Sequence, residues 1–149
     1  MAVQVGDPFP SVPVRQASGA LATVPQLLAG RPAVVYFYPK DNTPGCTREA
    51  HDFQRLLPEF EAAGVRVFGV SVDDQASHAT FAQGCGLTFP LLSDEGGALA
   101  RALGILHPER GYAKRTTYLV GADGRIRHIW EDVRVEGHAE EVLARARAL

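Results

Sequence analysis

The sequence has 149 residues, 46% of them hydrophobic and 21% charged, a composition that is ordinary for a soluble globular protein. The formal net charge is −2 and the arginines are scattered, which argues against nucleic acid or an anionic membrane as a partner. No apolar run approaches the roughly 20 residues of a membrane span, and the N-terminus lacks the basic and apolar regions of a signal peptide. We therefore expect one cytoplasmic domain, residues 1–149, with a substantial core.

The first part of the chain predicts a hairpin, a helical turn and a buried strand. The turn Ala17-Ser18-Gly19 separates two short extended arms, at 12–15 and 21–24. A short helical turn at 25–30 ends in glycine. The continuous apolar run 33–38 is typical of a central parallel strand.

The remaining elements alternate between strands and helices and then end with a hairpin and a helix. A strand at 65–72 precedes a helix at 75–83, for which Asp73-Asp74 supplies an N-cap. The pattern then predicts a strand at 89–92, a helix at 97–103, a loop at 105–113, strands at 115–120 and 125–130 joined by a turn, and a helix at 138–149. This order predicts an α/β fold with a sheet of mixed direction and helices on its faces.

Cys46 lies where the first buried strand passes into a helix. Apolar residues recur at spacings of three and four after it, at Phe53, Leu56, Leu57 and Phe60. The first N–H groups of a helix have no internal partner and its dipole favours negative charge, so this position would favour a thiolate, the reactive form of cysteine. Pro58 falls within the helical pattern, and we expect a kink or a break there.

The residues in front of Cys46 suit a reactive thiol. Thr43 offers a hydroxyl three residues earlier, Pro39 and Pro44 stiffen the loop, and Gly45 permits close approach of the backbone. An inert, buried cysteine at a helix start fits the same position equally well, because free cysteines are among the most buried residues.

The chain has two cysteines, Cys46 and Cys85. Two cysteines without a signal peptide argue against a structural disulfide framework, and they leave open a reversible catalytic disulfide or two free thiols. The five histidines show no metal-ligand spacing with either cysteine, and no glycine-rich phosphate loop is present. We therefore expect neither a metal nor a cofactor.

The pattern Pro39-x-x-x-Thr43-x-x-Cys46 resembles the active-site signature of the peroxiredoxins, and the longer run 38–50 is similar to their Q-type, or bacterioferritin comigratory protein, subgroup. The likeness extends over most of the chain, through the segments 6–10, 89–94 and 115–120. The resemblance implies a thioredoxin-like fold with a mixed central sheet and an N-terminal β-hairpin extension. It also implies a thiol-dependent peroxidase that acts on hydrogen peroxide and organic hydroperoxides.

The resemblance implies a role for each residue of the site. Cys46 would attack the peroxide and become a sulfenic acid. The Cys46 N–H, the Thr43 hydroxyl and the permanent cation of Arg115 would stabilise charge, and Pro39 and Gly45 would help to bind the substrate. Arg115 could otherwise be a surface charge at a strand end.

Glu49 lies three residues after Cys46, on the same side of the helix. A carboxylate there makes sense near a thiolate if it is engaged by an arginine, and Arg115 is the candidate that it would orient. A glutamate that simply suits the helix dipole is the equal alternative.

In the resolving step, a second thiol reacts with the sulfenic acid. The residues available for this step differ from those of much of the subgroup. Many members carry a second cysteine five residues after the first, where this chain has His51. Cys85, at the end of the next helix, is the only internal candidate, and a Cys46–Cys85 disulfide needs Cα atoms within about 7 Å. Alternatively, Cys85 is a packing residue and an external thiol resolves the sulfenic acid.

The resemblance also implies thioredoxin or another dithiol as the reductant, and a monomer. Two other functions use the same thiol. A disulfide carrier needs Cys-x-x-Cys, but Glu49 occupies the partner position. A redox sensor or holdase-like binding protein would be oxidised slowly and without turnover.

Overall fold

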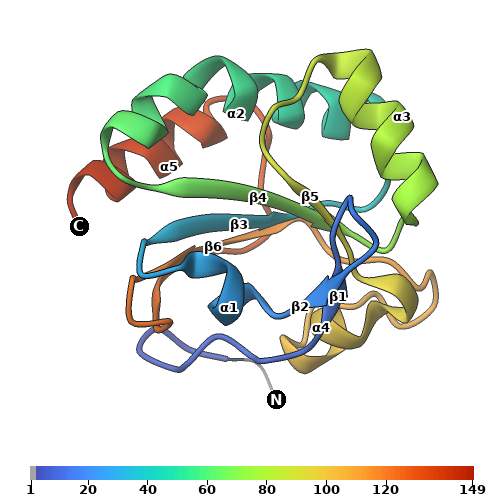
Figure 1. Cartoon of the computed structure of the whole chain (residues 1–149), viewed down its shortest axis with the longest axis horizontal. Coiled ribbons are helices and arrows are strands. Elements are labelled where there is room, and N and C mark those ends of the chain that lie inside the picture. The colour runs from blue at the N-terminus through green and yellow to red at the C-terminus, as the bar shows by residue number, and fades with distance from the viewer. Residues whose placement is uncertain (1–2) are drawn as a thin grey trace.

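The computed structural model describes residues 3–149, which form a seven-stranded mixed sheet with helices on both faces (Figure 1). The strands are β1 (Val14–Arg15), β2 (Leu21–Ala22), β3 (Ala33–Phe37), β4 (Arg66–Ser71), β5 (Leu91–Ser93), β6 (Thr116–Val120) and β7 (Ile126–Trp130). The helices are α1 (Val24–Leu28), α2 (Pro44–Ala62), α3 (Gln75–Cys85), α4 (Ala98–Ala102) and α5 (His138–Arg147), with a 3-10 turn, η1, at Glu95–Gly97.

Strand β3 lies at the centre of the sheet, whose order is β2-β1-β5-β4-β3-β6-β7. It pairs in parallel with β4 and antiparallel with β6, so the expected mixed direction is confirmed. Its side chains alternate between two cores: Val34 and Tyr36 face one, and Val35 and Phe37 face the other. Because both faces are covered, every residue of the strand is apolar and buried.

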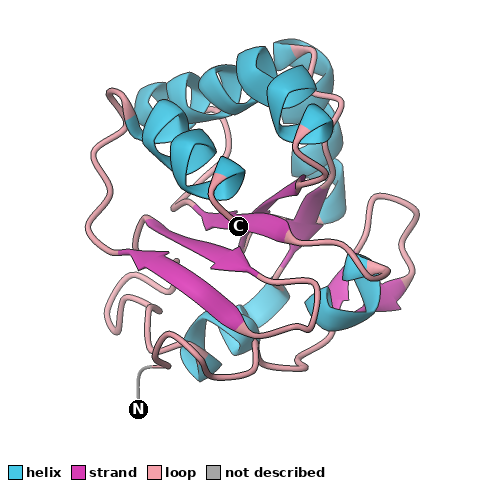
Figure 2. Cartoon of the chain, turned by 90° about the vertical axis from the view of Figure 1, so that its left-hand side faces the viewer, coloured by secondary structure: helices cyan, strands magenta, loops and turns pink. Residues whose placement is uncertain are grey.

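The helices divide between these two cores. Helices α2, α3 and α5 cover one face of the sheet, and the shorter α1 and α4 cover the other (Figure 1). Figure 2 shows the strands between these two helical layers. Helix α2 carries Cys46. The active-site candidates therefore lie on the face of the sheet that α2, α3 and α5 cover.

The N-terminal hairpin is present as expected. β1 and β2 pair antiparallel, and β1 also joins the edge of the sheet through Arg15 and Ser93 of β5. Two-residue strands offer few ladder hydrogen bonds, so this attachment to β5 is what makes the hairpin part of the main sheet. The expected α/β class with a hairpin extension is confirmed.

Of the kink or break expected at Pro58, the break is wrong, because α2 runs without interruption from Pro44 to Ala62. Pro58 faces solvent, where water can bond the Gln54 carbonyl that the missing N–H leaves free. Leu57 and Phe60, on either side, are buried in the core and hold both halves of the helix against the sheet. Packing of the apolar face therefore outweighs the local cost of the proline.

Two other elements begin later than expected. β5 starts at Leu91 rather than residue 89, because Pro90 has no N–H to donate to a ladder. The helix expected at 97–103 is a 3-10 turn followed by α4, and its cap is Asp94, whose carboxylate accepts from the N–H groups of Leu99 and Ala100. No helix within residues 3–149 is both long and apolar enough to cross a bilayer.

Candidate active site

Cys46 is the third residue of α2, directly after the loop that leaves β3. Thr43 is the N-cap residue, so the Cys46 N–H is among the groups without a partner inside the helix. The side chain is 1% exposed and packs in the core between α2 and the sheet. The predicted strand–turn–helix setting of this thiol is confirmed.

Arg115 reaches the Cys46 sulfur. Its Nη2 donates to Sγ over 3.4 Å, and its Nη1 donates to Glu49 Oε1 over 2.6 Å. The antiparallel register pairs Phe37 with Thr116, which places Arg115 beside the C-terminal end of β3, where the Cys46 loop begins. The Arg115 side chain keeps 18% of its surface exposed, whereas the cysteine beside it is 1% exposed.

Gly45 makes room for this guanidinium. A Cβ at position 45 would lie 3.2 Å from Arg115 Nη2, closer than most such contacts in proteins. Glycine therefore lets the arginine lie against the first turn of α2. Pro39 lies in the same loop, between β3 and the helix, and is half-buried.

Glu49 is buried with Arg115 as its partner. The residue is 1% exposed, and its second oxygen, Oε2, has no hydrogen-bond partner among the described residues. Burial raises the pKa of Glu49 to about 7, against the opposing influence of the Arg115 charge and hydrogen bond. The structure thus brings Cys46, Arg115 and Glu49 together, with the guanidinium between the thiol and the carboxyl group.

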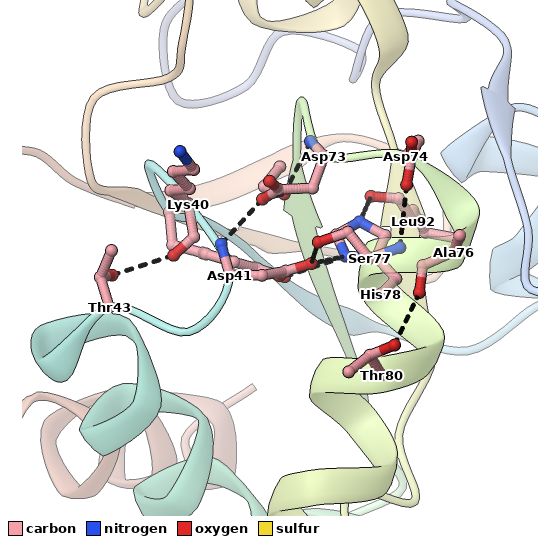
Figure 3. A network of polar contacts seen from close by, with 12 residues as sticks. Lys40, Asp41, Thr43, Asp73, Asp74, Ala76, Ser77, His78, Thr80 and Leu92 are labelled. Atoms are coloured by element: carbon pink, nitrogen blue, oxygen red, sulfur yellow. Dashed lines mark hydrogen bonds and ion pairs between the residues drawn. The ribbon is translucent and has the colours of Figure 1, made fainter.

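The Thr43 hydroxyl bonds the loop that precedes the helix. It donates to the Lys40 carbonyl over 2.9 Å and makes no cap hydrogen bond (Figure 3). Here the hydroxyl closes the loop in front of the helix. Its oxygen can still accept a hydrogen bond while it donates.

Cys85 is the last residue of α3, and Gly86 ends the helix with a left-handed conformation at φ 63°. The Cys85 side chain is half-buried against the same core cluster that contains Cys46. Both thiols are free. Burial, and to a lesser extent the charge of Asp41, raises the pKa of Cys85. Histidine 51 is exposed on α2, as expected for a helix surface.

A buried polar cluster beside the loop was not predicted. Asp41, Asp73 and His78 offer ligand atoms that lie within 4.8 Å of one another (Figure 3). The spacing of the histidines and cysteines gives no sign of these carboxylates. The available signal was topological: Asp41 follows β3 and Asp73 follows β4, and the carboxyl ends of parallel neighbours meet at one edge of a sheet.

These distances would suit a metal ion, but the ligand atoms already bond to one another and to their neighbours. Asp41 Oδ2 lies 2.8 Å from His78 Nδ1, and Asp73 Oδ2 accepts from Ser71 Oγ and from the Asp41 N–H. The cluster is therefore satisfied by hydrogen bonds.

Comparison with known proteins agrees with this geometry. Residues 5–129 match the model of the AhpC/TSA family. The protein named peroxiredoxin Bcp from Xanthomonas campestris is 44% identical over 137 residues, which cover 88% of this chain and 86% of that protein.

Two solved structures share the fold. The bacterioferritin comigratory protein of Xanthomonas campestris, described by its alkyl peroxide reduction activity, is 39% identical with a TM-score of 0.87, over 99% of this chain and 98% of that one. Peroxidoxin BcpB from Mycobacterium tuberculosis is 31% identical with a TM-score of 0.92, over 99% and 98%. These likenesses confirm the thioredoxin-like fold. The chain therefore belongs to the AhpC/TSA family and is a peroxiredoxin of the Q, or bacterioferritin comigratory protein, type, and thus a thiol peroxidase.

Proposed function

We propose that this peroxiredoxin reduces hydrogen peroxide and organic hydroperoxides with Cys46 as the attacking nucleophile. The observation that carries the proposal is the contact of 3.4 Å between Arg115 Nη2 and Cys46 Sγ, with Glu49 bound to the other side of the guanidinium. The described alkyl peroxide reduction activity of the Xanthomonas campestris relative supports organic hydroperoxides as substrates.

The reaction is a displacement at oxygen. The Cys46 thiolate attacks one peroxide oxygen, an S–O bond forms, and the O–O bond breaks. Sulfur is oxidised to a sulfenic acid, and the departing oxygen leaves as hydroxide or alkoxide and takes up a proton. Negative charge moves from sulfur to the leaving oxygen, so donors aimed at both atoms lower the barrier.

The loop and the arginine supply these donors. The Cys46 N–H and Arg115 stabilise charge on sulfur and on the peroxide. Thr43 Oγ1 accepts from the bound peroxide while its proton closes the loop onto the Lys40 carbonyl, and Pro39 and Gly45 shape the entrance. Glu49 orients the guanidinium through its bond of 2.6 Å.

We assign the resolving role to Cys85. Its thiol condenses with the Cys46 sulfenic acid, which forms an S–S bond and releases water. Both side chains pack in one core cluster, and Gly86 lets the end of α3 fray. A dithiol reductant such as thioredoxin then reduces the disulfide by exchange. In this proposal the chain acts as a monomer, a single domain over residues 1–149, in the reducing cytoplasm.

Intact mass after one equivalent of hydrogen peroxide tests the cycle. We expect the wild-type protein to lose about two hydrogens, because the sulfenic acid converts to a disulfide. The Cys85→Ser variant should instead gain one oxygen on Cys46, located by peptide mapping. A gain of one oxygen in both proteins would assign resolution to an external thiol. No change of mass at Cys46 in either protein would overturn the peroxidatic assignment.

The rate of Cys46 oxidation should also depend on Glu49 through pH. Above about pH 7 the carboxyl group is ionised and holds Arg115 by a charge-assisted bond; below it, the protonated group holds Arg115 less firmly. Glu49→Gln mimics the neutral form at every pH. The ratio of wild-type to variant oxidation rates should therefore be close to one at pH 5.5 and rise to roughly tenfold by pH 8.5.

Stopped-flow measurement of both proteins in a Cys85→Ser background gives this ratio. An exposed change on the same helix, His51→Gln, serves as the control and should give a ratio near one throughout. A ratio for Glu49→Gln that does not change with pH would show that the charge of Glu49 has no part in orienting Arg115.

A further inference from the structure

The loop in front of Cys46 is bound to the first turn of α3 by a buried carboxylate. Asp41 Oδ1 accepts from the Tyr38 hydroxyl over 2.6 Å, and Oδ2 lies 2.8 Å from both Ser77 Oγ and His78 Nδ1 (Figure 3). Asp41 is 5% exposed and His78 is 4% exposed. One side chain of the loop therefore holds two consecutive residues of α3.

His78 extends this connection to the sheet. Its Nε2 lies 3.0 Å from the Leu92 carbonyl of β5, which can only accept, so Nε2 carries a proton. Although burial opposes ionisation, hydrogen bonds from His78 and Tyr38 hold the pKa of Asp41 below its usual range. Asp41 is then a carboxylate, whose oxygens accept. The imidazole contacts the loop through Nδ1 and β5 through Nε2, and so links α3 to both.

The loop is tied to β4 as well. The Asp41 N–H donates to Asp73 Oδ2 over 2.8 Å, and the same oxygen accepts from Ser71 Oγ over 2.6 Å. Asp41 thus fastens the loop from its backbone and from its side chain. It lies five residues before Cys46 and two before the N-cap Thr43, so its position determines how the chain enters α2.

Helix α3 has few other anchors. Only His78 and Phe81 are buried among its residues, and most of its remaining surface is exposed. Cys85 lies seven residues after His78, roughly 10 Å further along the helix. The start of α3 is held by His78 and by Gln75, which donates to the Ala17 carbonyl, and the half that carries the second thiol packs through Phe81 and the partly buried Ala82 and Cys85.

We propose that Asp41, Ser77 and His78 form a latch that positions the Cys46 loop and α3 together, so that the same contacts favour oxidation of Cys46 when closed and free Cys85 to move when open. They are positioning residues, since none touches the sulfur. The part of this inference that concerns Cys85 rests on its proposed resolving role.

Opening the latch should affect the two reactions in opposite directions, because the Asp41 carboxylate holds both the Cys46 loop and α3. With the latch closed, the loop holds the first turn of α2 and its donors in place for the attack on peroxide. With the latch open, the loop loses this order, and α3 is released at the same time. Loss of the latch should therefore slow the oxidation of Cys46 and speed the formation of the disulfide.

The variant His78→Phe tests the latch, because the new ring fills the space beside Tyr38 but cannot bond Asp41 or Leu92. The matched control is Thr80→Ala, which removes the exposed hydroxyl that bonds the Ala76 carbonyl within α3. Amide hydrogen exchange over residues 79–85 should become roughly 10- to 100-fold faster in His78→Phe and should change little in Thr80→Ala. Exchange in β3 and β4 should stay slow, which separates release of α3 from global unfolding.

Two rates then report on function. In a Cys85→Ser background, oxidation of Cys46 by hydrogen peroxide should be about tenfold slower or more in His78→Phe. With Cys85 present, the disulfide should form faster in His78→Phe, by the same factor as the amide exchange of residues 79–85. Both processes require α3 to open. A purely structural defect would slow both reactions. Asp41→Asn, which keeps the size of the side chain, should act in the same directions, and the double variant should add little to either single one.

Unchanged exchange in α3, or an unchanged oxidation rate, in both His78→Phe and Asp41→Asn would overturn the latch. Failure of the proposed function looks different, because then the wild-type protein and the Thr80→Ala control form no intramolecular disulfide either. In that case the amide exchange of α3 and the oxidation rate of Cys46 in His78→Phe decide. Faster exchange with slower oxidation supports the latch, and no change in either contradicts it.

Discussion

Replacing Cys46 with serine should abolish peroxide reduction and leave the fold in place. The reaction needs an atom that can be oxidised by two electrons and reduced again, and a hydroxyl oxygen cannot take the place of sulfur in that cycle. Serine is also neutral at pH 7, whereas the thiolate is the form of cysteine that attacks. The expected activity is therefore zero within the sensitivity of the assay.

Peroxide consumption with a small dithiol as the reductant measures this loss, and circular dichroism checks the fold. Serine has nearly the volume of cysteine, so the 1% exposed site should repack with little change. Cys85→Ser is the matched control, since it removes the other thiol and should keep the first oxidation step. Residual turnover in Cys46→Ser comparable with that of the control would show that the peroxidatic residue lies elsewhere.

Replacing Arg115 with alanine should slow the oxidation of Cys46 by roughly 100- to 1000-fold, the usual cost of removing one preorganised donor. The change removes the only guanidinium that contacts Sγ among the described residues, at 3.4 Å. It also leaves Glu49 buried without its partner. Because the pKa of Glu49 is already about 7, the carboxyl group can take up a proton, which should limit the loss of stability to about 1–3 kcal/mol.

Stopped-flow oxidation and urea unfolding separate these two effects. Adding Glu49→Gln to Arg115→Ala should restore stability, because no buried charge is left alone, and should leave the rate low. Arg115→Lys should keep a positive charge but lose the two guanidinium N–H groups that bond sulfur and carboxylate together. We expect its Cys46 to be oxidised at least tenfold more slowly than in the wild-type protein. Arg55→Ala is the matched control, since Arg55 lies on α2 and pairs with Glu140 in solvent. An oxidation rate for Arg115→Ala equal to that of this control would refute the role.

The setting of Cys46 could be predicted because it depends on neighbours in the sequence. The apolar run that forms β3, the prolines that interrupt it and the spacing of Phe53, Leu56 and Phe60 act over a few residues, and the backbone follows them. The same local signals predicted the hairpins and α3. The peroxiredoxin signature rests on the same stretch, from Pro39 to Cys46.

The partners of the thiol could be named from the family resemblance, but their geometry could not be obtained from local patterns. Arg115 is 69 residues from Cys46 and reaches it because β6 pairs antiparallel with β3 in one register. Glu49 is buried rather than exposed because Arg115 lies against it. The Thr43 hydroxyl donates to the Lys40 carbonyl, a hydrogen bond that depends on the shape of the loop.

Tertiary structure alone decided two further features. Pro58 was expected to interrupt its helix, but burial of Leu57 and Phe60 holds the helix continuous. Asp41 and His78 are distant in sequence and no motif pairs them, and they meet because β3, β4 and β5 are neighbours whose carboxyl ends share an edge. The sequence by itself determined where the thiol lies, through short-range backbone preferences. Only the order and register of the strands, set by long-range packing, decided which charges surround it.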